Sequence, residues 1–407
     1  MDHDHDVIIA GGGLNGPTLA LALAGAGLSV AVVDARPAPD RAAHGFDGRA
    51  YSLALASRRL LTALGLWGRL APDAQPISKV VATQGLPGEG ADRLGMVFDS
   101  AEIEEGPVGH MVEDRFLYRA LLDAMQDRVT HVPGTSVIGQ EAVPGGITAV
   151  LSDGRRIFAR LLVGADGRQS GVAARAGIRR AGWDYPQTAL VAAVEHELPH
   201  GGEAHQFFMP AGPLAILPLT GNRSSIVWSE DSARAAAIAE LDDGGFLDLL
   251  RPRFGDFRGR IALAGPRFTY PLALGLAHDY AARRVALAGD SAHGVHPIAG
   301  QGLNLGLRDV AALAEVLVEA RRRGEDIGAP DVLSRYQQWR RFDATAMGLG
   351  MDGVNRLFSN ANPALRVARG LGMGAINAVG PLRRAFMRQA AGLSMDPMPR
   401  LLQGRPL

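Results

Sequence analysis

The sequence contains no cysteine and no long hydrophobic run, and these two absences narrow the classes of protein to which it can belong. Without cysteine, disulfide bonds, thiolate catalysis and cysteine-ligated metal sites are excluded. No stretch of about 18 uninterrupted apolar residues appears, so we expect no membrane-spanning helix. The acidic, polar start Met1–Asp6 does not resemble a secretory signal. We therefore expect a cytoplasmic protein.

A net positive charge is also absent, because 42 basic residues balance 42 acidic residues. Nucleic-acid-binding domains usually carry a basic excess, so no nucleic-acid partner is expected. Acidic residues are missing from one segment, Gly353–Met395, where arginines alternate with apolar residues. This segment is either an ordinary solvated face of C-terminal helices or a basic amphipathic surface for an anionic membrane or an acidic partner. Its arginines are Arg356, Arg366, Arg369, Arg383, Arg384 and Arg388.

Glycine is abundant, and three glycines near the N-terminus form a dinucleotide-binding fingerprint. The apolar run Val7–Ala10 predicts a buried strand, and the glycine-rich segment that follows it allows a tight turn and close approach of the backbone to a pyrophosphate. A second apolar strand, Val30–Asp34, ends in an acid at roughly the 20-residue spacing expected for a ribose ligand. That acid would repel a 2′-phosphate, so NADP is not expected here. The expected contacts are Gly11, Gly13, Leu14, Asn15, Gly16 and Asp34.

A second glycine-rich motif lies far along the chain, between Arg284 and Asp309. The apolar run Val285–Ala288 predicts a buried strand that ends at Gly289-Asp290. Beyond it, glycines surround Asn304 where the chain becomes helical, so bare backbone N–H groups can face a ligand. The carboxylate of Asp290 can accept hydrogen bonds from ribityl hydroxyls. A nicotinamide dehydrogenase, the competing interpretation, needs no second clamp, so the pair of motifs favours a flavin dinucleotide, FAD.

The order of predicted elements indicates an α/β protein with two domains, since 407 residues are many for a single core. Helical periodicity appears at 57–66 and 113–128, strand-like runs fill much of 186–270, and the chain is largely helical from 308 to 388. We expect a Rossmann-like FAD-binding domain with an inserted β-sheet substrate domain and C-terminal helices. The predicted ranges are 1–75, 104–180 and 271–330 for the FAD-binding domain, 76–103 and 181–270 for the substrate domain, and 331–407 for the helical region.

With these motifs, the chain resembles the single-component FAD-dependent aromatic monooxygenases of the para-hydroxybenzoate hydroxylase type. Within them it most resembles the ubiquinone-biosynthesis hydroxylases, and the resemblance covers nearly the whole length. Its most specific element is the run from His296 to Asp309, close to the signature of that subgroup. The other elements are Gly11–Gly16, Asp47 to Trp67, Gly164–Ser170, Gly289-Asp290 and the tail Met351–Ser359.

The resemblance implies how the chain would hold FAD. Asp34 and Arg36 would bind the adenosine end, Arg115 would reach the ribityl–pyrophosphate region, and Asp290 would bind the ribityl chain. Asp166 would stabilise the domain core and bear on the approach of nicotinamide. Backbone groups of the last motif would contact the pyrimidine edge of the isoalloxazine. The remaining contacts implied are Pro297, Gly300, Gly302, Leu303 and Asn304.

Two residues are implied near the reacting face of the flavin, Arg49 and His296, and we name them as catalytic candidates. Each has a plainer interpretation. Arg49 could be a structural ion-pair partner of Asp47, and His296 could be a turn residue that precedes Pro297.

The resemblance implies hydroxylation of the aromatic ring of a polyprenylated phenol through a flavin C4a-hydroperoxide. O2 would be the co-substrate, NAD(P)H or a separate reductase would supply electrons, and no metal would take part. Such a site must exclude water. An apolar lining that suits a prenylated phenol is expected from Phe207, Phe208, Met209, Ala215 and Leu217.

Two other functions stay open on the sequence. One is hydroxylation of a soluble aromatic compound in catabolism or secondary metabolism. The other, of a different class, is a non-enzymatic nucleotide-binding escort or scaffold protein, which would show no substrate-stimulated NAD(P)H oxidation. A prenylated substrate would favour a location peripheral to the inner face of the membrane, or contact with a quinone-biosynthesis complex, through the segment Gly353–Met395. Homo-oligomerisation is left open.

Overall fold

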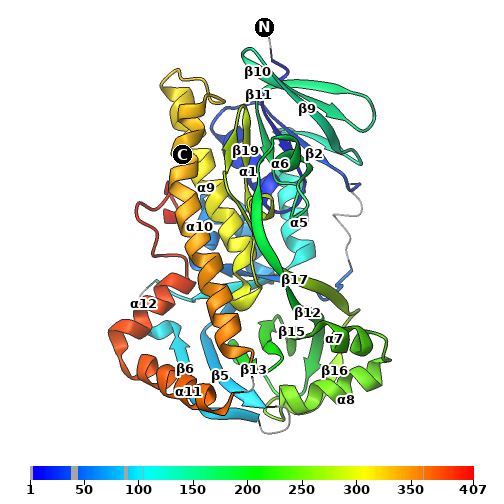
Figure 1. The fold of residues 1–407 in the computed structure, drawn as a ribbon, viewed down its shortest axis with the longest axis vertical. Coiled ribbons are helices and arrows are strands. Elements are labelled where there is room, and N and C mark those ends of the chain that lie inside the picture. Colours follow the sequence, from blue (N-terminus) through cyan, green and yellow to red (C-terminus); the bar gives the residue numbers. More distant parts are fainter. Residues whose placement is uncertain (1–2, 38–44, 87–89, 104, 361) are drawn as a thin grey trace.

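The computed structural model describes residues 3–37, 45–86, 90–103, 105–360 and 362–407. Residues 1–2, 38–44, 87–89, 104 and 361 lie outside the described residues. They include part of the start Met1–Asp6 and short parts of the predicted domain ranges. Two large sheets, a small third sheet and a set of helices make up the described chain (Figure 1). The α/β fold class predicted from the sequence is confirmed.

The first large sheet, in the upper part of Figure 1, has a parallel centre. Strands β8, β2, β1, β11 and β19 run parallel in that order, β18 pairs with β19, and β10 and β9 extend from β11 as antiparallel partners. Parallel strands are covered on both faces, which explains the continuous apolar runs of β1 and β2. The bounds are β1 His5–Ala10, β2 Val30–Asp34, β8 Thr130–Pro133, β9 Val137–Val143, β10 Gly146–Leu151, β11 Arg156–Gly164, β18 Ala281–Ala282 and β19 Val285–Leu287.

The second large sheet, in the lower part of Figure 1, joins segments that are distant in the sequence. Its strands follow the order β20-β17-β12-β15-β14-β13-β5-β6, and β16 pairs with β12. The long strands β12 and β17 pair along most of their length and reach from this sheet toward the first (Figure 1). The bounds are β5 Lys79–Leu86, β6 Gly90–Asp99, β12 Arg180–His196, β13 Glu203–Met209, β14 Gly212–Leu219, β15 Arg223–Asp231, β16 Ile261–Leu263, β17 Phe268–Ala277 and β20 His293–Gly294.

A small third sheet and the helices complete the fold. The small sheet has the order β3-β7-β4, with bounds β3 Ala50–Ala54, β4 Gln75–Ile77 and β7 Gly109–Glu113. The predicted helix at 57–66 is shorter and begins earlier, whereas α7 and α8 were not predicted. The bounds are α1 Asn15–Gly25, α3 Leu55–Ala63, α4 Trp67–Leu70, α5 Asp114–Met125, α6 Gly171–Arg175, α7 Ser232–Ala239, α8 Asp243–Phe254, α9 Gln301–Arg322, α10 Pro330–Phe358, α11 Pro363–Ala378 and α12 Gly380–Ala390.

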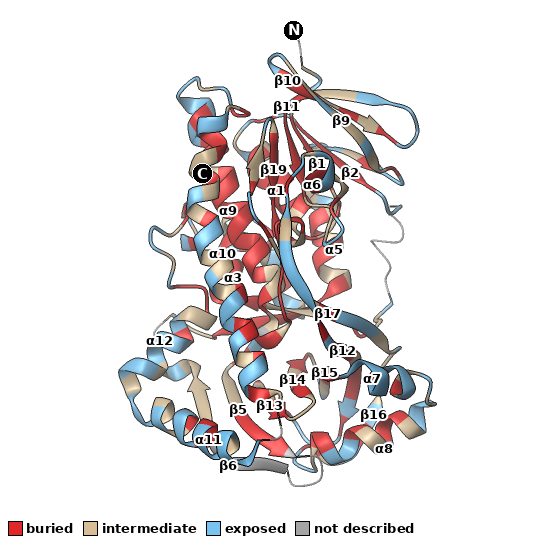
Figure 2. Ribbon diagram, in the orientation of Figure 1, coloured by how far each residue is buried: buried red, intermediate tan, exposed pale blue. Residues whose placement is uncertain are grey.

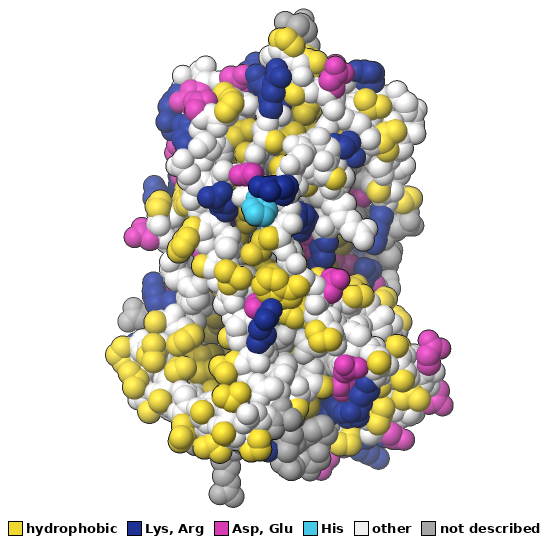
Figure 3. All heavy atoms as spheres, viewed as in Figure 1, with side chains coloured by type: hydrophobic (Ala, Val, Ile, Leu, Met, Phe, Trp, Pro, Cys, Tyr) yellow, Lys and Arg dark blue, Asp and Glu magenta, His cyan; other side chains and the backbone are white. Residues whose placement is uncertain are grey.

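The C-terminal helices differ in how far they are buried (Figure 2). Helix α9 packs between α1 and α10 and is buried over most of its length. Helices α11 and α12 lie at the outside, and hydrophobic side chains gather on the surface above them (Figure 3). In the described part of the chain, no helix combines the length and the apolar character that a membrane span requires.

Candidate active site

A first cavity of about 380 Å³ lies where the strands β1, β2 and β11 end. The carboxyl ends of parallel strands are the usual ligand-binding edge of such a sheet. The floor of the cavity is the predicted fingerprint, and its walls come from the segments that follow β2 and β11. It is lined by Ala10, Gly11, Gly13, Val33, Asp34, Ala35, Ser136, Val137, Ala165, Asp166, Gly167 and Gly171.

The fingerprint glycines differ in why they are needed. A Cβ atom on Gly11 would lie 2.1 Å from the carbonyl oxygen of Ala165, and one on Gly16 would lie 2.0 Å from the carbonyl oxygen of Gly11. These two glycines therefore allow the chain itself to pack. A Cβ on Gly13 would meet no protein atom within 4 Å, so Gly13 leaves room beside the N-terminus of α1. That position favours an anionic group such as a pyrophosphate.

The acid that ends β2 is placed as the sequence predicts, but its neighbour is not. Asp34 is buried, lines the first cavity, and accepts a 3.1 Å hydrogen bond from the backbone N–H of Arg36. The side chain of Arg36 is exposed and does not line the cavity. Asp166 also lines the cavity, while its carboxylate accepts hydrogen bonds from Ser170 and from the backbone of Val172 at the start of α6.

A second cavity, of about 420 Å³, continues from the first, and Gly13, Ala165 and Gly167 line both. It brings together the two motifs that the sequence separates by more than half its length. We treat the two adjoining cavities as one trough, with Asp34 in its first part and the glycine-rich turn where the two parts meet. From the predicted set, the second cavity is lined by Gly13, Leu14, Asn15, Asp290, Pro297, Gly300, Gly302 and Leu303.

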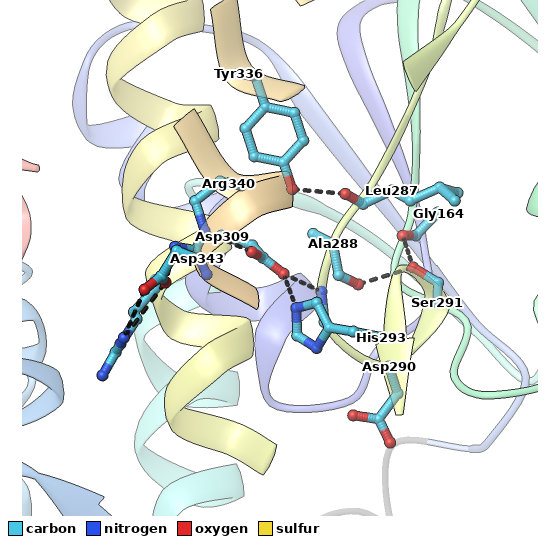
Figure 4. A network of polar contacts seen from close by, with 12 residues as sticks. Gly164, Leu287, Ala288, Asp290, Ser291, His293, Asp309, Tyr336, Arg340 and Asp343 are labelled. Carbon is cyan, nitrogen blue, oxygen red and sulfur yellow. Dashed lines mark hydrogen bonds and ion pairs between the residues drawn. The ribbon is translucent and has the colours of Figure 1, made fainter. Parts of the chain in front are cut away.

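Hydrogen bonds of the neighbouring residue Ser291 hold the turn that carries Asp290 in place (Figure 4). The hydroxyl oxygen of Ser291 lies 2.5 and 2.8 Å from the carbonyl oxygens of Gly164 and Ala288, which share its one proton. The guanidinium of Arg180 donates to the carbonyls of Asp290 and Ser291, at 3.1 and 3.0 Å. These contacts leave the Asp290 carboxylate pointing away from the buried network, where it lines the second cavity.

Asn304 shapes the second cavity although its side chain does not line it. Its amide oxygen accepts from the N–H of Ala54 and the hydroxyl of Ser57, at 2.8 and 2.7 Å. Its amide nitrogen donates to the carbonyls of Ser52 and Gly300, at 2.8 and 2.9 Å. All four hydrogen-bonding positions of the amide are therefore used within the protein. Asn304 fixes Ser52 and Gly300, which both line the cavity, and the side chain itself is not available to a ligand.

Two further predicted arginines, Arg49 and Arg115, are engaged with carboxylates and are not among the residues that line the trough. Arg49 lies 2.5 Å from Asp47 and 3.4 Å from Asp114, and the hydrogen bond with Asp47 raises the pKa of Arg49. Arg115 donates a 2.7 Å hydrogen bond to the buried Glu113. The ion pair with Asp47, which is the plainer interpretation of Arg49, is therefore present in the structure. A catalytic role for Arg49 stays a prediction.

His296 is fully buried, next to two cavity-lining residues, Val295 and Pro297. Neither ring nitrogen has a hydrogen-bond partner among the described residues. The ring packs edge-on against Tyr185 at 5.3 Å between centroids. Burial lowers the pKa of His296 to about 4, so the imidazole is neutral near pH 7.

The second large sheet forms one wall of the second cavity, and the alternation of side chains along its strands decides which residues face that cavity. Gln206 on β13, Ala215 on β14 and Val227 on β15 lie directly opposite one another and face the cavity. Leu217, two residues after Ala215, shares this face. Phe207 and Met209 have the opposite parity and are buried in the core beneath α8, so their predicted place in the lining is wrong.

The trough fits a long dinucleotide with two unlike ends. One end offers an acid for a ribose, the middle offers open backbone at a helix N-terminus, and the far end combines an apolar wall with a glycine-rich segment. Among the described residues, no group of three or more imidazole or carboxylate side chains is arranged to hold a metal ion.

Comparison with known proteins agrees with this geometry. A sequence model of the FAD binding domain family matches residues 4–348. The ubiquinone hydroxylase UbiL of Rhodospirillum rubrum is 46% identical over 370 residues, which cover 89% of this chain and 84% of that protein. The 3-demethoxyubiquinol 3-hydroxylase of Escherichia coli is 38% identical, covering 89% of this chain and 92% of that protein.

The chain belongs to the ubiquinone-biosynthesis FAD monooxygenases. It is an FAD-dependent hydroxylase, so the predicted family, enzyme class and FAD cofactor are confirmed, and the nicotinamide dehydrogenase and the non-enzymatic scaffold are wrong. The fold has a solved counterpart in p-nitrophenol 4-monooxygenase PnpA from Pseudomonas putida DLL-E4. The two superpose with a TM-score of 0.81, at 18% identity, over 97% of this chain and 99% of that one.

Several residues of this trough carry no role predicted from the sequence. Arg168 lies 3.4 Å from the carboxylate of Asp290, and Arg180 holds the same turn from behind. Tyr118 on α5 and Gln206 on β13 line the second cavity. Arg168 lies within a motif that pointed to the family, but Arg180 has no local sequence signal because its partners are about 110 residues away.

Proposed function

We propose that the enzyme hydroxylates the aromatic ring of a polyprenylated phenol in ubiquinone biosynthesis. The observation that carries this proposal is the second cavity, where the FAD-binding motif of residues 289–303 faces an apolar wall made by Ala215, Leu217 and Val227. The printed names of the relatives, a ubiquinone hydroxylase and a demethoxyubiquinol hydroxylase, support the same substrate class.

Bound FAD, once reduced, supplies the activation of O2 from which one oxygen atom reaches the ring. The chain's residues bind, orient and shield. The N-terminus of α1 beside Gly13 holds the pyrophosphate, Asp34 holds the ribose, and Asp290 accepts hydrogen bonds from the ribityl hydroxyls. The apolar wall keeps water from the reacting face, and the neutral His296, packed against Tyr185, adds no charge beside the cavity. Electrons come from NAD(P)H or from a separate reductase.

The predicted domain ranges remain part of this proposal. Their support is that β5 and β6, from the range 76–103, join the same sheet as the strands from 181–270. The cavity with the apolar wall then lies between the proposed FAD-binding and substrate domains, a common place for a ligand site.

We further propose that the C-terminal segment contacts an anionic membrane. Nine of the fourteen large apolar side chains that the described residues expose lie between Phe342 and Phe386, so exposure of this kind is concentrated on α10, α11 and α12. Among the most exposed are Val367 and Leu371 on α11, at 64% and 62%. An ordinary solvated helix face would not gather so many. The alternative to be tested is that this segment contacts a quinone-biosynthesis complex instead of a membrane.

The positive charge of this segment is smaller than its composition suggests. Arg383 pairs with Glu102 at 2.7 Å, Arg388 pairs with Glu105, and Arg356 pairs with Asp352. Arg384 is exposed. The apolar side chains therefore contribute more to the proposed contact than the arginines do.

Deletion of the gene in its source organism tests the substrate class. The proposal expects a polyprenylated phenol that lacks one ring hydroxyl to accumulate, and complementation to remove it. If the quinone pool stays intact and growth on a soluble aromatic compound is lost instead, the alternative function in catabolism replaces it.

A further inference from the structure

Two more cavities adjoin the apolar wall of the second cavity. An inner chamber of about 190 Å³ has Ser52, Gln206 and Leu217 as walls in common with the second cavity. Beyond it lies a surface groove of about 1080 Å³, formed by α10, α12, β6 and the segment after α12. The chamber and the groove adjoin, because several residues line both. These shared residues are Met96, Phe98, Ile298, Gln301 and Ala390.

The inner chamber is almost wholly apolar. No arginine, lysine, aspartate or glutamate lines it, and the amide of Asn304 at its edge is already hydrogen-bonded within the protein. One imidazole, that of His205, borders it, and burial lowers the pKa of this residue to about 4. At neutral pH the chamber therefore presents no charge, and it favours a hydrocarbon over water.

The surface groove continues this character toward solvent. Its lining includes Phe342, which is 82% exposed, and Phe386, which is 45% exposed. The charged residues at its border include Arg335 and Asp343, which pair with Glu325 and with Arg340. In Figure 3 a hollow lies beside the hydrophobic surface of α11 and α12, on the same face. The groove thus opens next to the proposed membrane contact.

We propose that the inner chamber and the surface groove bind the prenyl tail of the substrate while its ring lies in the second cavity. The inference rests on the proposed function. Continuity selects this occupant, because a tail joined to a ring in the second cavity meets the chamber first and the groove next. Methionines such as Met96 and Met387 border the chamber, and their flexible side chains can move aside for a thin hydrocarbon chain. The tail enters through the groove, from the lipid.

Ala390 is the specificity-determining residue of this passage, because it is small and lines both the chamber and the groove. We expect Ala390→Trp to lower kcat/KM for a farnesylated phenol by about tenfold or more, since loss of as few as two buried methylene contacts has that effect. The same phenol with a methyl group in place of the tail should be hydroxylated as by the wild type. Ala385→Trp, on the exposed face of the same helix, is the matched control and should change neither rate.

Labelling of the wild-type holoenzyme gives a second test that does not depend on a variant. A farnesylated phenol with a diazirine at the far end of its tail should, on illumination, label the groove around Trp339 and Phe386. Labelling elsewhere, or equal losses for the two phenols with Ala390→Trp, would overturn the passage. If neither phenol were hydroxylated by the wild type, the proposed function would fail instead, so the two failures are distinct.

Discussion

The imidazole Nε2 of His293 and the carboxylate Oδ2 of Asp309 lie 2.5 Å apart, and neither side chain is exposed (Figure 4). The same oxygen accepts the backbone N–H of Gly289 at 2.9 Å, and the other oxygen accepts from Arg340 at 2.7 Å. Burial alone would raise the pKa of Asp309, but His293 and Arg340 outweigh it and lower that pKa. One carboxylate thus ties the turn that presents Asp290 to both α9 and α10.

Replacing Asp309 separates this bracing role from ligand contact. Asp309→Asn leaves Arg340 partly uncompensated in the core, and breaking a buried ion pair costs about 3–5 kcal/mol of stability. We expect a lower free energy of unfolding together with weaker FAD binding. Asp290→Ala should weaken FAD binding by about 1.5–3 kcal/mol and leave the apoprotein as stable as before. Urea unfolding and FAD titration measure both quantities. Loss of FAD affinity without loss of stability in Asp309→Asn would contradict the bracing role.

Gly13 of the fingerprint and its neighbour Gly12 provide a second contrast. Gly13→Ala adds a methyl group where no protein atom lies within 4 Å, so the apoprotein should unfold as the wild type does while FAD affinity falls at least about tenfold. Gly12→Ala places its Cβ 2.2 Å from the carboxylate of Asp34, so the apoprotein itself should be destabilised. Thermal unfolding without FAD distinguishes the two. A destabilised Gly13→Ala apoprotein would show that Gly13 is needed for packing rather than for the cofactor.

Stability should fall as the pH is lowered through the mildly acidic range. Burial lowers the pKa of His110, His205 and His296 to about 4 each, while in the unfolded chain these groups take up protons near pH 6.5. Between those limits the unfolded state binds more protons, and each such histidine costs up to about 1.4 kcal/mol per pH unit as the pH falls. His296→Phe should remove the contribution of one histidine to this dependence of the free energy of unfolding on pH. An unaltered slope in His296→Phe would contradict the buried neutral imidazole.

Membrane contact should depend mainly on apolar side chains. A fully buried apolar side chain contributes about 1.5–3 kcal/mol, against about 1 kcal/mol for a basic residue near an anionic surface. The triple change of Leu371, Leu382 and Phe386 to Ser should therefore abolish sedimentation with anionic vesicles. Arg384→Gln should only weaken it, in a salt-dependent way. Ile138→Ser, at an exposed apolar residue far from this face, is the control. If the triple variant still sedimented, a protein partner would be the better occupant.

The parts of the site that could be predicted are those that local chemistry determines. A glycine at 11 or 16 is required by backbone contacts within a few ångströms, and the acids at 34 and 290 end buried strands, so motif and spacing sufficed. Helix α7 was missed although its signal was present. Asp231 precedes an alanine-rich run and accepts hydrogen bonds from the N–H groups of Ala233 and Arg234, as an N-cap does.

Other residues depend on register or on distant partners, which a single sequence does not reveal. Phe207 and Ala215 are both apolar strand residues, and only the pairing of β13 with β14 decides which one faces the cavity. The place of Arg49 near the flavin stays a prediction, and the structure adds that Asp47 and Asp114 orient its guanidinium. The passage behind the apolar wall joins residues from near 96, 298 and 390, and no local pattern connects them.

The central claim, ring hydroxylation of a prenylated phenol, is tested most directly by a single turnover with isotopic oxygen. The FAD-loaded enzyme is photoreduced without O2, with EDTA as the sacrificial electron donor in place of NAD(P)H or a reductase. It is then mixed with a farnesylated phenol and exposed to ¹⁸O2. The product is then analysed by mass spectrometry and by NMR of the ring carbons. We predict one ¹⁸O atom on the aromatic ring, in an amount that follows the FAD content. Product oxygen derived from water, or reoxidation of the enzyme with the phenol unchanged, would contradict the claim.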